Sequence, residues 1–401
     1  MTFVRLLCTL LTRTPPARPR KGYAMTVTFQ NPNSFVKLIC VSLAAMSWLL
    51  LMPGQSARAD TSHADAYMAQ AWDLYNQGQP GQAMPLAQKA LEELQLVLEH
   101  EHPKMAEYYY HLGLISLELD DKDQAMRHFS EALLILETLG AEPDRISATC
   151  LFLLSEELFV RGEVEHSINM GADAIEHWEA VLDPDAQELA YFNANFGRRL
   201  MKFFAFKEAQ PFLEKALDIL QQGPAAGGAE VASLIQELAF CHLRQGDPFT
   251  AKDLYFQALN ILKTVHGNDH PLTAMCLDNM GRAYFEAGDF AAAVEVHEQA
   301  LAVLEAGMDP GDPHLAVCNN NLGEALAATG QCQEALPHFE RALEIEPSQY
   351  NPAFPPNYFF IANMAFCHED LGNADQAGEL MAKARELQCP GCPLERMWPE
   401  P

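Results

Sequence analysis

The feature that most restricts the fold of this chain is a repeat of 42 residues that runs through eight units without a slip. Its middle column contains only small side chains, namely Ala83, Ala125, Ser167, Ala209, Ala251, Ala293, Ala335 and Ala377. Two further small columns keep the same spacing, one from Ala71 to Ala365 and one from Ala90 to Ala384. A period of this length is typical of stacked two-helix units. Because small residues let facing helices pack closely, the pattern predicts eight helix pairs.

Turn residues divide each unit at the same place. Five residues before the middle column, six units carry glycine, whereas the second and fourth units carry Asp120 and Phe204. Glycine at this position ends the first helix of a unit at little cost. The final unit has Arg385 where the earlier units have leucine or isoleucine, as expected for a unit with no successor to cover it. Four linkers place a proline at one repeat position, which suits the first turn of the next helix: Pro103, Pro271, Pro313 and Pro355.

Two segments carry a family resemblance most clearly. HPLTAMCLDNMGRAYFEAGDFAAAVEVHEQALAVLE, from His270, and NNNLGEALAATGQCQEALPHFERALEIEP, from Asn319, resemble the tetratricopeptide repeat (TPR). The 42-residue period with His-Pro linkers is similar to the kinesin-light-chain type of this repeat. The resemblance implies an all-α fold, a right-handed superhelical solenoid of about eight TPR units over residues 60–390. It also implies a concave groove that binds peptides or partner domains.

In that family the groove is lined by the first helix of each unit. The resemblance therefore implies these candidate peptide-binding residues: Asn195, Arg198, Asn279, Arg282, Asn320, Asn321 and Asn363. A side-chain amide offers an extended peptide both a donor and an acceptor. The alternative is that the asparagines belong to the repeat itself and bind local backbone groups. The expected partner is a protein or peptide.

The N-terminal segment has the parts of an export signal in the right order. An apolar run of 15 residues, Leu38–Met52, follows Lys37 and precedes a small-x-small sequence that ends at Ala59. We expect residues 25–59 to be a signal peptide cleaved after Ala59, and residues 1–24 to be a non-native extension, with Met25 as the start. This predicts a periplasmic or secreted protein with no membrane span after cleavage. The alternative is an uncleaved, membrane-anchored form.

The charge balance excludes nucleic acid as a partner. The chain carries 26 basic and 54 acidic residues, a net charge of −28. Loss of residues 1–59 removes seven basic and no acidic residues, leaving 19 against 54 and a net charge of −35. Such a chain repels a phosphate backbone. The acidic residues occur in every unit, which favours a solvated surface over a cation site.

The cysteines and histidines give little support for catalysis. Cys389 and Cys392 form a CxxC pair that spans the boundary between the last repeat and a C-terminal tail, residues 391–401. A local disulfide is favoured there over a redox pair or half of a metal site. Five other cysteines lie on a packing stripe and should be buried thiols: Cys150, Cys241, Cys276, Cys318 and Cys367. No HExxH, phosphate-binding loop or other cofactor or metal motif occurs.

These observations predict an exported, non-enzymatic TPR scaffold that mediates protein interaction through its groove. The first alternative is a membrane-anchored assembly factor of the cell envelope that keeps its apolar N-terminal helix. The second is a thiol-redox protein acting through Cys389 and Cys392.

Overall fold

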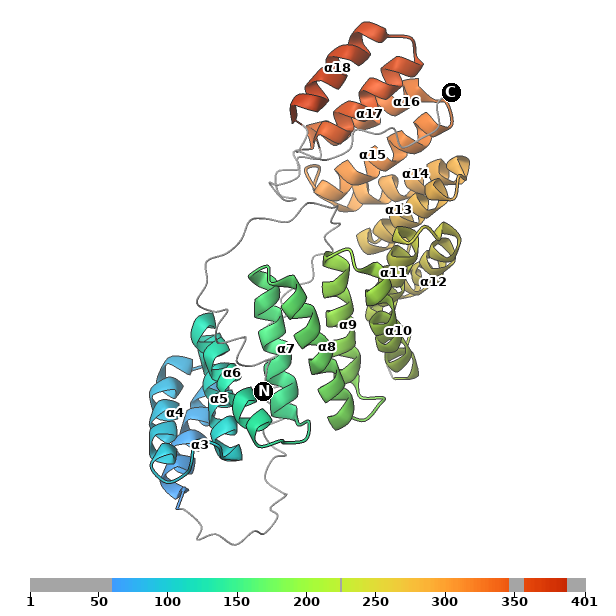
Figure 1. Cartoon of the computed structure of the whole chain (residues 1–401). Coiled ribbons are helices and arrows are strands. Elements are labelled where there is room, and N and C mark those ends of the chain that lie inside the picture. The colour runs from blue at the N-terminus through green and yellow to red at the C-terminus, as the bar shows by residue number, and fades with distance from the viewer. Residues whose placement is uncertain (1–59, 224–225, 346–356, 388–401) are drawn as a thin grey trace. The chain divides into compact units, whose positions relative to one another are not determined.

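The computed structural model describes residues 60–223, 226–345 and 357–387. The expected signal peptide, the expected N-terminal extension and the tail with Cys389 and Cys392 lie outside these residues. Every regular element in the described ranges is a helix, and the helices follow one another as eight pairs (Figure 1). The predicted all-α repeat architecture is therefore confirmed. No helix in the described part of the chain is both long and apolar enough to cross a membrane.

Contacts divide the chain into two compact units, and the division falls within one helix, after Phe196. The first unit contains α3 (Ser62–Asn76), α4 (Pro80–Gln95), α5 (Pro103–Glu118), α6 (Lys122–Thr138), α7 (Arg145–Val160), α8 (Val164–Val181) and the first part of α9 (Gln187–Lys202). The second unit contains the end of α9, α10 (Phe206–Gln222), α11 (Ala229–Arg244), α12 (Pro248–His266), α13 (Pro271–Glu286), α14 (Phe290–Gly307), α15 (Pro313–Ala328), α16 (Cys332–Glu344), α17 (Asn357–Asp370) and α18 (Ala374–Leu387). Within each unit, helices pack on their neighbours along the chain, as α5 does on α6 and α13 on α14.

The turn between the two helices of a pair keeps one backbone conformation whatever residue occupies it. Gly78, Gly162 and their equivalents have φ between 73° and 81°, in the left-handed region. Asp120 and Phe204, which replace glycine, adopt φ of 59° and 62°. A side chain with a Cβ is strained in this region. The packing of the helices therefore imposes the turn geometry even where the local sequence does not favour it.

The small columns lie where helices approach most closely. All eight alanines of the last column, from Ala90 to Ala384, are fully buried. Gly113 and Gly323 each lie against the ring of a phenylalanine on the second helix of the pair, Phe129 and Phe339. In these pairs the small residue thus makes room for a large side chain, where the sequence led us to expect a small one. Arg385 is exposed in the last pair, as expected.

The residues before three of the linker prolines, Pro103, Pro271 and Pro313, cap the first helices, whereas Pro355 lies outside the described residues. His102 accepts a hydrogen bond through Nδ1 from the backbone N–H of Lys104, and His270 does the same for Leu272. Asp312 accepts one from the backbone N–H of His314. These side chains satisfy amide groups that have no partner within the helix. The His-Pro and Asp-Pro pairs are therefore helix starts.

Candidate functional site

Three of the candidate asparagines occupy equivalent positions on α13, α15 and α17. Asn321 and Asn363 are buried, with 8% and 2% of their surfaces exposed, whereas Asn279 is half-buried. Asn195 holds the same position on α9 and is also half-buried. The asparagines of one sequence column therefore lie in two kinds of environment, buried and half-buried. The buried members have little surface to offer a peptide.

The buried asparagines connect successive repeats. Asn321 Nδ2 donates to both carboxylate oxygens of Asp278, at 3.3 and 3.1 Å. Asn363 Nδ2 donates to Asn320 Oδ1 at 2.9 Å and to Glu324 Oε1 at 3.0 Å. Asn320 also donates to Glu324, at 2.9 Å. Since the bonds of Asn321 and Asn363 join first helices of adjacent repeats, they stabilise the stacking of α13, α15 and α17.

The two candidate arginines use their guanidinium groups in the same way. Arg282 donates through Nη1 to Glu324 of the next repeat at 2.8 Å and through Nε to Glu286 at 3.1 Å. Arg198 donates to two carboxylates of the next repeat, those of Glu237 and Glu230, at 2.8 and 2.7 Å. Burial raises the pKa of Glu237, and the neighbouring Arg198 opposes that rise. Each arginine is therefore a cation held between two acids.

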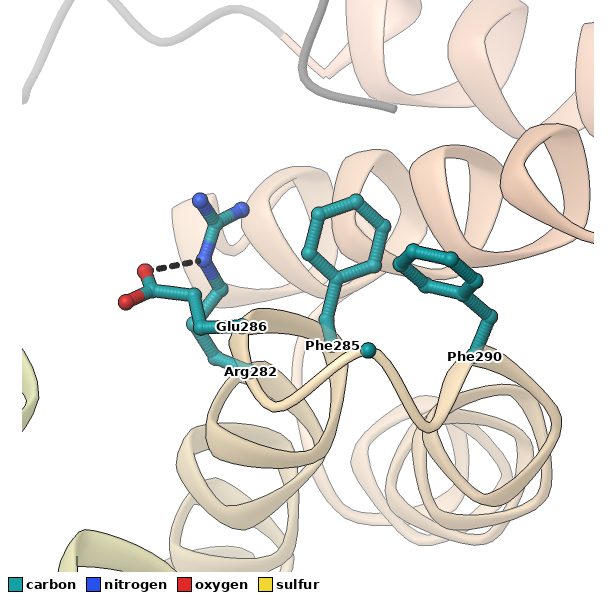
Figure 2. A pocket seen from close by; sticks show the side chains of 5 residues that line it. Arg282, Phe285, Glu286 and Phe290 are labelled. Carbon is teal, nitrogen blue, oxygen red and sulfur yellow. Dashed lines mark hydrogen bonds and ion pairs between the residues drawn. The ribbon is translucent and has the colours of Figure 1, made fainter. Parts of the chain in front are cut away.

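A hollow of about 370 Å³ lies beside Arg282, where α13 ends and α14 begins (Figure 2). Its lining comprises Arg282, Phe285, Glu286, Gly288 and Phe290. The Phe285 and Phe290 rings meet edge to face, with centroids 5.1 Å apart, and the Arg282 guanidinium lies 5.2 Å from the Phe285 ring centre. One wall is thus aromatic and the other is formed by an ion pair. Such a lining suits an apolar or aromatic side chain that has a polar neighbour.

A buried polar cluster lies between the sixth and seventh repeats. His297 on α14 is fully buried, and its Nδ1 lies 2.7 Å from Asp278 Oδ1 on α13. The Cys318 thiol on α15 donates to the backbone carbonyl of His297 at 3.7 Å. Sequence reasoning missed this cluster because its members share no motif spacing. The available signal was a histidine in a core column that holds Tyr255 and Phe339 in the flanking repeats.

Several cysteines expected on the packing stripe are buried. Cys150, Cys241, Cys276 and Cys367 are each fully buried, as is Cys318. Burial raises the pKa of Cys241 and of Cys276 to about 12. These two thiols therefore stay protonated at neutral pH, and a protonated thiol is a poor nucleophile.

Comparisons with known protein families match the repeat region of the chain. Three family models, each described as tetratricopeptide repeat, match the chain: one over residues 230–306, a second over residues 63–104 and 315–345, and a third over residues 106–135. A comparison with curated proteins gave no match. The matched segments fall in both units and include the hollow at α13 and α14.

Solved structures with a similar fold cover half or more of the chain. The apo form of RapI is 16% identical with a TM-score of 0.55, over 80% of this chain and 85% of that chain. BtubC (BKLC) from P. vanneervenii is 21% identical with a TM-score of 0.45, over 57% and 93%. Nearly identical TPR-like repeats assigned to a kinesin light chain of Podosopora anserina are 24% identical with a TM-score of 0.43, over 51% and 96%. At these identities the likeness concerns the fold alone.

Proposed function

Because this chain is a tetratricopeptide repeat protein, we propose that it is a scaffold that binds a protein or peptide partner and performs no catalysis of its own. The supporting observation is the hollow at the junction of α13 and α14, where two aromatic rings stand beside an ion pair. The hollow is open to solvent and offers a partner apolar rings and charged groups side by side.

The charges around the hollow favour a basic partner segment. Arg282 is balanced by Glu286 and by Glu324, so this group of three carries one net negative charge. The whole chain is acidic as well, with a net charge of −28. A partner of opposite charge associates faster with this chain, whereas an acidic competitor is repelled. We therefore propose a peptide in which an apolar side chain enters the hollow next to a lysine or arginine.

The candidate groove residues divide into two roles under this proposal. Asn279 is half-buried, and no hydrogen bond of its side chain occurs among the described residues, so its amide is available to a peptide backbone. Asn321 and Asn363 hold the repeats together, and their replacement would change stability together with binding. Peptide contact by the candidate residues stays a prediction. Replacement of Asn279 tests it best, because within the described residues this side chain makes no hydrogen bond that stabilises the repeats.

A peptide library displayed on phage and selected on the purified chain provides the test. We expect the enriched peptides to share an apolar residue beside a basic one. Phe290→Ala should weaken their binding by about 10- to 100-fold, since burying one such side chain contributes roughly 1.5–3 kcal/mol. Phe249→Ala is the matched control, because Phe249 is 64% exposed and does not line the hollow. Equal binding by parent and Phe290→Ala protein would move the site elsewhere.

Export is the second part of the proposal. The ordered parts of residues 25–59 support a cleaved signal peptide and a periplasmic or secreted scaffold. N-terminal sequencing of the protein from the extracytoplasmic fraction should then begin at Asp60. An intact N-terminus in the membrane fraction would support the membrane-anchored form instead.

A further inference from the structure

Three side chains with metal-binding chemistry converge in the buried polar cluster of the second unit. Asp278, His297 and Cys318 come from three successive helices, α13, α14 and α15. One ligand atom of each lies within 4.8 Å of the other two, and all three side chains are buried. Residues so far apart in sequence meet here because the helices of repeats six and seven pack side by side.

We propose that Asp278, His297 and Cys318 bind one Zn²⁺ ion. A carboxylate oxygen, an imidazole nitrogen and a thiolate sulfur are the three kinds of ligand that zinc uses in proteins. On binding, Nδ1 of the neutral His297 ring takes the ion while the ring proton resides on Nε2. The thiol proton of Cys318 passes to solvent, and no group is oxidised or reduced. The Asp278 carboxylate and the Cys318 thiolate then balance the two charges of the ion, and a neutral cluster is less costly to bury than an isolated carboxylate.

The preceding repeat shows which part of the cluster is ordinary packing. Cys276 occupies the position of Cys318 one repeat earlier, and its thiol donates to the Tyr255 carbonyl at 3.6 Å. The thiol is thus placed in the same way in both repeats. At the other two ligand positions the preceding repeat has Tyr255 and Gln236, so only the later repeat combines a thiol with an imidazole and a carboxylate.

Two further residues shape the cluster. A methyl group at Gly281 would lie 2.6–2.8 Å from three atoms of the His297 ring, so glycine there makes room for the imidazole. Asn321 donates to both oxygens of Asp278 and fixes the orientation of the carboxylate. Hydrogen bonds of this kind to a ligating carboxylate raise metal affinity, and their loss typically costs about 10- to 100-fold. We therefore assign Asn321 a positioning role.

The test uses the full chain carrying Cys389→Ser and Cys392→Ser, because the tail thiols are themselves potential metal ligands. Since the site is buried, the ion is expected to enter during folding. The protein is refolded with Zn²⁺, dialysed against a weak chelator and analysed for metal by mass spectrometry. We expect one Zn²⁺ per chain and, after refolding with Co²⁺, a thiolate-to-cobalt absorption band. Linkage also predicts a higher melting temperature with zinc.

Matched variants separate the metal site from packing. His297→Phe introduces the residue found at the equivalent Phe339, so the fold should hold while zinc and the cobalt band are lost. Cys318→Ser should lose both signals, whereas Cys276→Ser should keep them. Asn321→Ala should bind zinc about 10- to 100-fold more weakly. A refolded parent without zinc, or a folded His297→Phe protein that keeps it, would overturn the proposal. Partner binding through Phe290 does not enter any of these readouts.

Discussion

The close approach of the two helices of the seventh pair can be tested with a single methyl group. At Gly323 on α15, a methyl group would lie 2.6, 2.8 and 2.9 Å from ring carbons Cε1, Cζ and Cδ1 of Phe339. Ordinary contacts of this kind are 3.4–4 Å long. Phe339 is fully buried, so its ring has little freedom to move away. Gly323→Ala should therefore force α15 and α16 apart or strain the ring.

The expected magnitude is the balance of two opposing effects. Overpacking of a well-filled core costs roughly 1–3 kcal/mol. Alanine is more favourable than glycine within a helix by about 0.5–1 kcal/mol. The free energy of unfolding should therefore fall by up to about 2.5 kcal/mol. Gly378 on α18 is the matched control, because it is exposed and, apart from its chain neighbours and its own helix backbone, no atom lies within 4 Å of the added methyl group. Gly378→Ala should raise the stability by about 0.5–1 kcal/mol.

Urea unfolding followed by far-UV circular dichroism measures both changes. The two substitutions are chemically identical, so the higher helix propensity of alanine raises both urea midpoints. Only the contact of the added methyl group with Phe339 can lower the midpoint of Gly323→Ala. A Gly323→Ala midpoint that rises as far as that of Gly378→Ala would refute the close contact of Gly323 with Phe339. If the free energy of unfolding has the same slope against urea concentration in parent and variants, the unfolding transition itself is the same.

Three further predictions concern other parts of the fold. Asp120→Gly should stabilise the chain by up to about 1 kcal/mol, because φ at Asp120 is 59° and a Cβ is strained there; an unchanged melting temperature would contradict this. Ala300→Leu should destabilise by roughly 1–3 kcal/mol, since Ala300 is fully buried, and an unaltered thermal melt would mean that it is not at an interface. Burial lowers the pKa of His111 to about 4. As the pH falls from about 6.5 to 4, the unfolded chain binds this proton first, so the free energy of unfolding should fall by up to about 3 kcal/mol. His111→Gln should remove that part of the pH dependence in urea titrations at pH 7 and pH 5.

The repeat architecture was predictable because its causes are periodic in sequence. The number of helix pairs and the position of the turn within each pair follow from the small columns and the turn residues, which act through contacts repeated in every unit. Asp120 and Phe204 weakened the sequence signal at two turns, yet both turns formed with the conformation that glycine has elsewhere. Helix packing thus outweighed local preference at these two positions.

The candidate site was less predictable, because one column does not fix one environment. Asn279 and Asn321 are equivalent in sequence, but only Asn321 has an acid one repeat earlier that is positioned to accept its hydrogen bonds, namely Asp278. The pairing of Arg282 with Glu324 likewise spans 42 residues. A search for donor and acceptor pairs separated by about one repeat would have found these bonds. The aromatic hollow depends on the path of the turn between Phe285 and Phe290, which residue spacing alone does not give.

The dependence of each helix on its immediate neighbours also limits how this chain can change in length. Removal of a whole unit, such as residues 271–312, would leave α12 facing α15, whose small column lies where that of α13 did. By contrast, deletion of one residue within a helix rotates all that follows in that helix by about 100°. Recombination can therefore lengthen or shorten this protein in steps of 42 residues, whereas a single-residue deletion would turn the buried alanines toward solvent.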